Sequence, residues 1–351
     1  MVSMDLVRVL ITGGAGFVGS NLADYLLRNS DADVVIYDNM SRQGVENNVE
    51  WLKSRYSKSG RLQVVKADIR DYARLVKAAK DVNVIYHTAA QVAVTTSLAD
   101  PFTDFEVNAR GTLNVLEAAR KLRTEPIIVL TSTNKVFGDL GRVAVKEEKT
   151  RYDFKNMKAG VDEKIPLDPI SPYGCSKCTA DEYVLDYYRT YGLKTVVFRM
   201  SCIYGPRQFG TEDQGWICFF AVSALLGRLI TIYGDGKQVR DVLFIDDLVR
   251  AFDLAVKNIG KAKGNAYNIG GGSKNTFSLL ELIEYLKLLT GKEIKFTFDK
   301  WRPGDQRVYY TDIRRAKKEL GWSPQVDKRD GVKKLLTWAQ DNMAFFRYFY
   351  R

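Results

Sequence analysis

The first 200 residues alternate between short apolar runs and longer amphipathic segments. Runs rich in β-branched residues predict strands at residues 7–12, 34–37, 62–65, 84–87, 127–131 and 194–199. Apolar positions at helical spacing predict helices at residues 16–28, 102–122 and 172–191. Strands and helices in alternation are typical of βαβ units. The pattern therefore predicts an α/β fold with a doubly wound parallel sheet, the Rossmann fold, covered by helices on both faces.

The pattern is looser in the rest of the chain. Residues 141–170 are polar and charged, and they predict an insertion ahead of the helix at 172–191. Further helices are predicted near residues 217–226, 245–256, 278–289 and 330–346. We therefore expect a dinucleotide-binding domain over residues 1–200 and a smaller α/β lobe over residues 201–351, with some segments after residue 240 returning to the first domain.

Composition narrows the class of protein. A chain of 351 residues, 46% of them hydrophobic, can bury a large core without disulfide or metal. Its single histidine argues against a multi-histidine metal site, so no metal is expected. The longest apolar stretch, residues 217–226, is about half of what a bilayer requires, so no membrane association is expected. Four cysteines without a secretory signal favour the cytoplasm. The net charge of +11 leaves nucleic acid, an anionic small molecule or mere solubility open.

A glycine-rich segment, Gly13–Gly19, follows the first predicted strand and opens the first predicted helix. Glycines in such a turn let the backbone approach a pyrophosphate, and the helix N-terminus offers free N–H groups to the anion. Asp38 ends the second strand, where a carboxylate would accept hydrogen bonds from a ribose diol and repel a 2′-phosphate. The segment therefore predicts NAD as the cofactor, although Arg42 keeps NADP open.

Other cofactor contacts are expected where strands end, because ligands of open parallel sheets lie beyond the carboxyl ends of the strands. With the glycine-rich turn, these positions give Gly13, Gly16, Phe17, Val18, Gly19, Asp38, Asn39, Ser41, Arg42, Asp68, Ile69, Thr88, Ala89 and Ala90. His87, at the end of the fourth strand, is expected to be structural.

Tyr173 and Lys177 are four residues apart on a predicted helix, so their side chains share one face. An ordinary tyrosine, with a pKa of about 10, is a poor base at neutral pH. A neighbouring ammonium and a cationic nicotinamide would favour its phenolate form. The hydroxyls of Ser132 and Thr133, at the end of a strand, could hydrogen-bond the reacting oxygen. We therefore predict a nicotinamide-dependent catalytic site built from these side chains.

These motifs resemble the extended short-chain dehydrogenase/reductases, within the nucleotide-sugar epimerase and dehydratase superfamily, over nearly the whole chain. The resemblance implies retained NAD in the Rossmann lobe and a nucleotide sugar in the C-terminal lobe. It matches Thr133, Tyr173 and Lys177 to the catalytic residues of the family. It also implies cofactor contacts from Asn108, Ser132, Tyr173 and Lys177, and a homodimer formed by helices such as 102–122 and 172–191.

Two positions separate the subfamilies. The 4,6-dehydratases carry an Asp-Glu pair straight after the catalytic threonine, whereas this chain has Asn134 and Lys135, which disfavours dehydration. The UDP-galactose 4-epimerases usually have an asparagine shortly after the sixth strand, where this chain reads Arg199–Cys202. The closer resemblance is to the CDP-tyvelose (CDP-paratose) 2-epimerases, through residues 132–139, 171–177, 207–209, 213–216, 236–243 and 305–308.

This resemblance implies inversion of C2 of a CDP-3,6-dideoxyhexose through a transient 2-keto sugar, with NAD as hydride acceptor. It assigns Arg240 and Arg302 to the diphosphate and Asp305 to the nucleotide ribose, while Thr133 would hold the reacting oxygen. Gln214 and Trp216 could contact the base or its ribose. A UDP-hexose 4-epimerase is the alternative. An NAD-binding sensor for nucleic acid is more distant, because the sequence has no helix-turn-helix and no basic tail.

Two motifs lie outside this scheme. Cys175 and Cys178 form a C-x-x-C pair on the predicted catalytic helix, without a second pair, which favours helix packing over zinc or redox chemistry. The chain end, 345–351, is unusually aromatic. We expect it to pack onto the chain's own surface, with an oligomer contact as the alternative.

Overall fold

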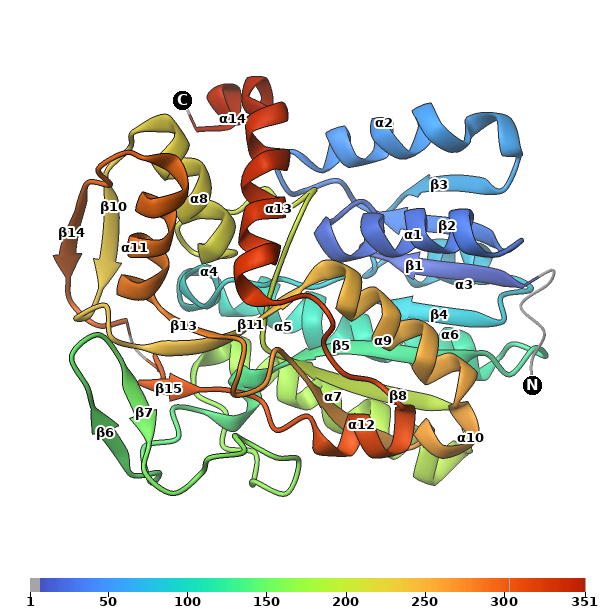
Figure 1. Cartoon of the computed structure of the whole chain (residues 1–351). Coiled ribbons are helices and arrows are strands. Elements are labelled where there is room, and N and C mark those ends of the chain that lie inside the picture. Colours follow the sequence, from blue (N-terminus) through green and yellow to red (C-terminus); the bar gives the residue numbers. More distant parts are fainter. Residues whose placement is uncertain (1–6, 303, 351) are drawn as a thin grey trace.

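The computed structural model, which describes residues 7–302 and 304–350, is built around a seven-stranded parallel sheet (Figure 1). The strand order is β12-β8-β5-β4-β1-β2-β3. The strands are β1 (Arg8–Thr12), β2 (Asp33–Asp38), β3 (Leu62–Lys66), β4 (Val84–His87), β5 (Ile127–Thr133), β8 (Thr195–Met200) and β12 (Asn265–Ile269). The predicted doubly wound α/β fold is therefore confirmed, and β12 joins the sheet beside β8 from a distant part of the chain.

Both faces of this sheet are covered by helices because alternate side chains of each strand point to opposite sides. On β1, Val9 and Ile11 lie in one hydrophobic core, and Leu10 lies in the other. The first core is closed by α1 (Phe17–Asn29), α2 (Val45–Tyr56) and α9 (Ile245–Lys257). The second core is closed by α3 (Tyr72–Ala78), α6 (Gly111–Arg120) and α7 (Ser171–Tyr191).

A second group of elements lies to the left of the main sheet in Figure 1. Its centre is β11, which pairs in parallel with β9 and β15 and antiparallel with β13, while β10 pairs with β14. The strands are β9 (Cys202–Tyr204), β10 (Ile230–Tyr233), β11 (Val239–Phe244), β13 (Thr276–Ser278), β14 (Phe296–Asp299) and β15 (Val308–Tyr309). Strand β12 belongs to the main sheet, and α9 and α12 (Arg314–Leu320) pack in the core on one of its faces, although all three follow residue 240. The domain boundary at residue 200 stays a prediction.

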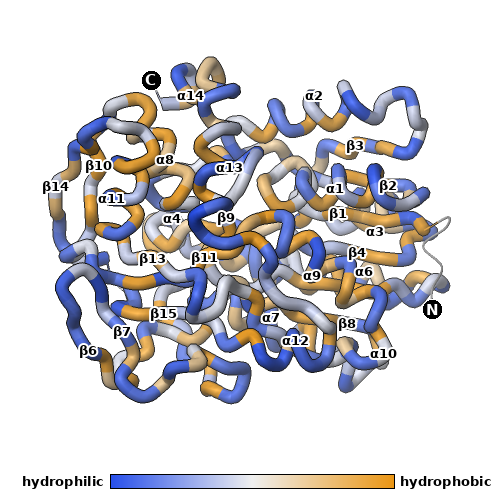
Figure 2. Tube along the Cα trace, in the orientation of Figure 1, coloured by the Kyte–Doolittle hydropathy of each residue, from blue (hydrophilic) through white to orange (hydrophobic). Residues whose placement is uncertain are grey.

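The apolar run at residues 217–226 forms α8 (Trp216–Leu226). It packs with α11 (Leu279–Thr290) and α13 (Lys328–Asp341) in the core, which explains why it is apolar on every side. Figure 2 shows hydrophobic positions along α8 and along the strands of the main sheet, and hydrophilic ones around β6 and β7. Within the described residues, no helix combines the length and apolar character needed to cross a bilayer.

Two predicted helices are interrupted. The helix predicted over 102–122 consists of α5 (Pro101–Phe105), a π-helical turn over Glu106–Arg110, and α6. The helix predicted over 330–346 ends at Asp341 and resumes as α14 (Met343–Phe349). The insertion at 141–170 contains the hairpin β6 (Val145–Glu147) and β7 (Tyr152–Phe154), which lies against the second lobe through the hydrogen bond from Tyr152 N to Lys237 O, 2.8 Å. The remaining helices are α4 (Val94–Ala99) and α10 (Ile259–Ala262), with short turns η1 (Ser57–Ser59) and η3 (Asn134–Phe137).

Helix α7 is anchored to the sheet by a buried ion pair. The Arg199 guanidinium of β8 donates from Nε and Nη2 to the two carboxylate oxygens of Asp181, both at 2.9 Å. Ser132 Oγ of β5 donates to the same carboxylate at 2.8 Å. Paired charges in a planar bidentate geometry tolerate little rotation. The ion pair therefore fixes the rotation of α7 about its axis against β5 and β8.

We expect Asp181→Asn to lower the free energy of unfolding by about 3–5 kcal/mol, because it leaves the buried Arg199 guanidinium without its counter-charge. Chemical denaturation measures this change. Asp186→Asn is the matched control, since Asp186 is exposed on the same helix and its loss should cost less than about 0.5 kcal/mol. Equal stability of Asp181→Asn and the unmodified protein would contradict the anchoring role.

Candidate active site

The glycine-rich turn brings the start of α1 close to the ends of β1 and β4. Gly13 has a left-handed φ of +70°, and a Cβ there would lie 2.6 Å from the backbone nitrogen of Ala89. A Cβ on Gly19 would lie 2.5 Å from the carbonyl oxygen of Gly13. Gly16 is the N-cap of α1 and no side chain caps this terminus, so its first N–H groups face outward without intrahelical partners. This arrangement suits a pyrophosphate.

Asp38 is held beside this turn. Its carboxylate accepts hydrogen bonds from the backbone N–H groups of Ala15, at 3.0 Å, and Met40, at 2.8 Å. Burial raises the pKa of Asp38, and these hydrogen bonds oppose the rise. Asn39 Nδ2 donates to Asp68 at the end of β3, at 2.9 Å. The predicted ribose-binding carboxylate therefore lies where a dinucleotide on the turn would reach it.

The other predicted cofactor residues differ in what their side chains do. Ser41 and Arg42 are exposed after β2, whereas Ile69 is buried in the core. Thr88 Oγ1 donates to Thr12 O at 2.7 Å. His87 is enclosed between two threonine hydroxyls, and burial lowers its pKa to about 3, which fits a neutral, structural side chain.

Asn108 occupies the π-helical turn, which is where the predicted continuous helix is interrupted. Its Nδ2 lies 3.1 Å from each of three acceptors, the Gln91 carbonyl, the Asp104 carboxylate and the Ser176 hydroxyl. A π-helical turn redirects side chains that a regular α-helix would place elsewhere. Asn108 therefore ties the helix of residues 101–120 to α7.

A cavity of about 390 Å³ lies at the carboxyl end of the main sheet. The predicted catalytic residues Thr133, Tyr173 and Lys177 line it, and so do all five further predicted substrate residues, Gln214, Trp216, Arg240, Arg302 and Asp305. Of the predicted cofactor residues, it is also lined by Phe17, Val18, Thr88, Ala90 and Ser132. Its lining does not include Gly13, Gly16, Gly19, Asp38, Asn39, Ser41, Arg42, Asp68, Ile69, Ala89 and Asn108.

The environment of Tyr173 differs from our expectation. Burial raises the pKa of its phenol to about 12, and only the Thr133 hydroxyl is found to oppose the rise. The Lys177 ammonium donates instead to the Thr131 carbonyl, at 2.6 Å, and burial lowers its pKa to about 8. Lys177 is thus not among the groups that act on the pKa of Tyr173 here, and the expected effect of the lysine and the nicotinamide together stays a prediction. Desolvation is the largest cause of the raised pKa, and the charge of Asp104 adds to it.

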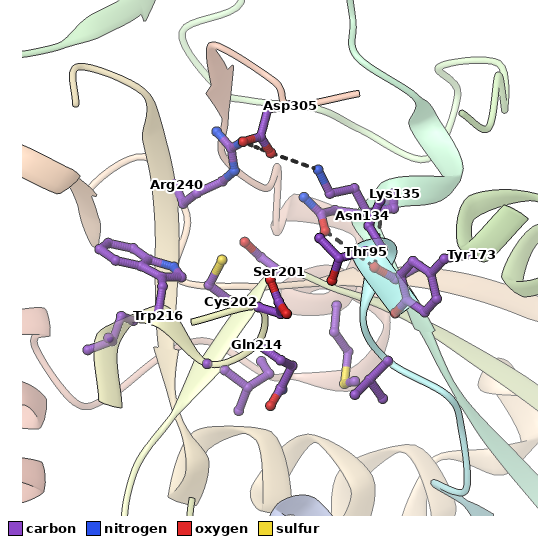
Figure 3. Close-up of a pocket in the computed structure, with 18 of the residues that line it drawn as sticks. Thr95, Asn134, Lys135, Tyr173, Ser201, Cys202, Gln214, Trp216, Arg240 and Asp305 are labelled. Carbon is purple, nitrogen blue, oxygen red and sulfur yellow. Dashed lines mark hydrogen bonds and ion pairs between the residues drawn. The ribbon is translucent and has the colours of Figure 1, made fainter. Parts of the chain in front are cut away.

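Charged side chains of both signs also line the cavity, namely Lys135, Arg240 and Arg302 together with Glu212, Asp213 and Asp305. Figure 3 shows Trp216 and Tyr173 on opposite sides, with Arg240 and Asp305 between them. Arg240 Nη2 lies 3.7 Å from Asp305 Oδ1. The Arg302 guanidinium lies 3.8 Å from the centroid of the Tyr233 ring and pairs with Asp213 at 3.1 Å.

The cavity is also lined by Asn134 and Lys135, from which the sequence alone predicts only that dehydration is disfavoured. Lys135 Nζ lies 3.3 Å from Asp305 Oδ1 and donates to Gly304 O at 3.2 Å, and burial lowers its pKa. Asn134 Nδ2 donates to Gln306 Oε1 at 3.1 Å. Their position directly after Thr133 was the signal that could have placed them in the site. The cavity residues that no sequence motif indicated include Thr95, Met200 and Cys202.

The motif Cys175-x-x-Cys178 shows no bond, since the four cysteines are free thiols. Among the described residues, no group of three or more His, Cys, Asp or Glu side chains is placed to hold a metal ion.

The chain is similar to known proteins over nearly its whole length. The model of the GDP-mannose 4,6-dehydratase family matches residues 10–335. The chain belongs to this family. It is 44% identical to the CDP-paratose 2-epimerase of Salmonella typhi over 341 residues, which cover 95% of this chain and 99% of that protein.

Solved structures of the same type are similar over nearly the whole chain. The dTDP-glucose 4,6-dehydratase of Streptomyces venezuelae, solved with NAD, is 30% identical with a TM-score of 0.84, and the match covers 98% of this chain and 100% of that one. The UDP-glucuronic acid 4-epimerase of Bacillus cereus, solved with UDP-glucuronic acid and NAD, is 30% identical with a TM-score of 0.82, over 96% and 100%. The protein is thus an NAD-dependent enzyme of the nucleotide-sugar epimerase and dehydratase type, which confirms the predicted superfamily and cofactor.

We expect Lys177→Met to stabilise the cofactor-free protein at pH 7. Lowering the pKa from 10.5 to about 8 corresponds to at most about 3 kcal/mol, at about 1.36 kcal/mol per pKa unit. The penalty of the buried charge is complete below pH 8, because both folded and unfolded lysines are then protonated. Between pH 8 and 10.5 the folded protein binds fewer protons than the unfolded one, so the stability of the unmodified protein rises.

Chemical denaturation at pH 7 and at pH 10 measures this difference. The advantage of Lys177→Met should shrink as the pH rises through this window. A variant that is less stable than the unmodified protein at pH 7, or whose advantage grows with pH, would contradict the lowered pKa.

Proposed function

We propose that the enzyme interconverts CDP-paratose and CDP-tyvelose by inverting C2 of the 3,6-dideoxyhexose. The observation that carries this proposal is the cavity itself, because one cavity is lined both by Thr133, Tyr173 and Lys177 and by Arg240 and Arg302. The 44% identity with CDP-paratose 2-epimerase supports the sugar and the base. The UDP-glucuronic acid 4-epimerase of Bacillus cereus is only 30% identical to this chain, so the alternative of a UDP-hexose 4-epimerase is less well supported.

Inversion at C2 requires a transient oxidation. The carbonyl carbon C1 is masked as an acetal, so the proton on C2 is not acidic enough for direct removal. NAD, when bound, supplies a reversible hydride acceptor, and the glycine-rich turn, the α1 N-terminus and Asp38 are the groups that would hold it. The sugar must then turn in the cavity, so that the hydride returns to the other face of C2.

The chain's own residues manage the proton. Tyr173 would accept the proton of the C2 hydroxyl as hydride leaves C2, and return it to the same oxygen when hydride comes back. The Thr133 hydroxyl would hydrogen-bond that oxygen throughout. Because burial raises the pKa of Tyr173 to about 12, the phenolate must be favoured by positive charge in the assembled site. Lys177 would hold the nicotinamide ribose and contribute part of that charge.

The two residues after Thr133 favour this reaction over dehydration. A dehydratase removes a carbon-bound proton and protonates the leaving hydroxyl, and carboxyl groups are suited to both steps. Here Asn134 has no ionisable group, and its amide is bonded to Gln306. Lys135 is paired with Asp305. Neither residue offers a carboxylate next to the sugar.

The arginines of the cavity would hold the nucleotide. Arg240 and Arg302 are suited to the two phosphates, because a guanidinium fork matches phosphate oxygens. Asp305, which lies near both Arg240 and Lys135, would accept hydrogen bonds from the ribose. Gln214 and Trp216 would contact the base or its ribose.

We also propose a homodimer formed through the helices around α5 and α7. Large apolar side chains are exposed on this part of the surface, with Phe102 84% accessible and Phe105 and Tyr191 more than half accessible. Exposed apolar groups of this size mark interaction surfaces.

We also propose that the protein resides in a reducing compartment, the cytoplasm, which the four free thiols favour.

The function is tested by offering CDP-paratose, CDP-tyvelose and UDP-galactose, and by following ring-proton couplings by NMR. We expect conversion of the two CDP-sugars into each other, with a change at H2 only. Tyr173→Phe should lower turnover by about 10²–10⁴-fold while NAD stays bound, because only the proton acceptor is lost. Turnover of UDP-galactose alone, inverted at C4, would favour the 4-epimerase. Undiminished turnover of Tyr173→Phe would rule out the proposed mechanism.

The dimer is tested by light scattering at micromolar concentration. The unmodified enzyme should have the mass of two chains, and Phe102→Asp should shift it toward one, because a carboxylate would be buried without a partner. Leu288→Asp is the control, since Leu288 is 77% exposed on α11, away from the proposed interface. A monomeric unmodified enzyme would exclude the dimer.

A further inference from the structure

We propose that the C-terminal helix α14 is a positioning element for the nucleotide, which acts through the 206–215 segment. This segment connects β9 to α8. The inference rests on the proposed function in one respect, namely that the cavity binds a nucleoside diphosphate.

The inner side of the segment forms part of the cavity wall. Its residues that line the cavity are Gln208, Glu212, Asp213, Gln214 and Gly215. The backbones of Thr211 and Gln214 exchange two hydrogen bonds, of 2.8 and 3.2 Å, which close a tight turn. Gln208 is buried, and its amide Nε2 would lie 2.9 Å from a Cβ on Gly215. These contacts couple the residues of the segment to one another. A shift of the backbone at Gly210 would therefore also move Gln214 and Trp216.

The outer side of the segment rests on α14. Phe209 follows the cavity-lining Gln208 and packs against the rings of Phe346 and Phe349, with centroid distances of 5.8 and 5.7 Å. Tyr350, the C-cap residue of α14, donates from its hydroxyl to the carbonyl oxygen of Gly210. Phe346 is fully buried. The aromatic chain end therefore packs on its own chain, and Figure 1 shows α14 beside the upper end of α13.

Other contacts hold the segment from the remaining sides. The Arg207 guanidinium lies between two indole rings, 4.1 Å from the centroid of Trp51 and 5.9 Å from that of Trp338. At the inner end, Gln214 Oε1 accepts from Arg42 Nη2 at 3.1 Å, which connects the segment to the loop after Asp38. Gly210 is the residue at which the end of α14 contacts the segment through a hydrogen bond.

Helix α14 acts on the site indirectly. Its residues are absent from the cavity lining, and among the described hydrogen bonds and ring contacts none joins it to Thr133, Tyr173 or Lys177. It also lies beyond residues 10–335, which the family model matches. We therefore expect α14 to affect the binding of the nucleotide, and not the chemical step.

Tyr350→Phe tests this inference, because it removes one hydroxyl and leaves the ring packing in place. We expect the KM for the nucleotide sugar and the Kd for CDP, measured by calorimetry, to rise about fivefold, as for the loss of one hydrogen bond. The kcat and the amount of bound NAD should stay within about twofold. Tyr348→Phe is the matched control, since Tyr348 is 76% exposed on the same helix. Arg228→Gln is a second, milder variant, because Arg228 donates to the Tyr350 carbonyl and is exposed.

The outcomes separate this inference from the proposed function. Unchanged CDP affinity in both Tyr350→Phe and Arg228→Gln, or a fall in kcat at constant KM, would overturn the inference. If the unmodified enzyme does not convert CDP-paratose, the proposed function fails. The inference is then decided by comparing the Kd of Tyr350→Phe with that of the unmodified enzyme, for CDP and for UDP. If the unmodified enzyme binds neither nucleotide, the inference is overturned too.

Discussion

The rotation of α7 is the constraint on which the site depends. Tyr173, Lys177 and Asp181 follow one another at intervals of four residues and therefore share one face of the helix. Asp181 is paired with Arg199 of β8, and Lys177 donates to the Thr131 carbonyl of β5. With two of the three side chains fixed to the sheet, the third is placed beside Thr133 at the end of β5. The catalytic geometry is thus a consequence of how one helix is attached to two strands.

The burial that accompanies this placement also disfavours the charged form of each group. It raises the pKa of Tyr173 to about 12 and lowers that of Lys177 to about 8, so each is shifted toward its neutral form. A positive charge introduced beside the phenol would lower the tyrosine pKa again. The phenol of Tyr173 can therefore act as a base only once such a charge is present.

Much of the fold and of the site could be predicted from local patterns. Strands buried on both faces are continuous apolar runs, and the glycine turn, Asp38 and the Tyr173–Lys177 spacing are each contained in a few neighbouring residues. What could not be predicted depends on distant partners. Lys135 meets Asp305 across 170 positions of sequence, and the pKa of Tyr173 is set by burial that no spacing reveals. The π-helical turn at Asn108 interrupts a sequence with regular helical periodicity for the same reason.

An epimerase of the proposed kind has to hold its substrate firmly and yet let the sugar turn over. Binding contacts to the reacting ring would oppose that rotation, because they would have to be broken in every turnover. The affinity must therefore come from the nucleotide. The cavity contains groups for both tasks, since Arg240, Arg302 and residues of the 206–215 segment line it for the nucleotide and the hydroxyls of Thr133 and Tyr173 line it for the sugar. The nucleotide end can be rigid because α14 and the ion pairs support it, and the sugar end can be sparse because the reaction needs only one oxygen to be held.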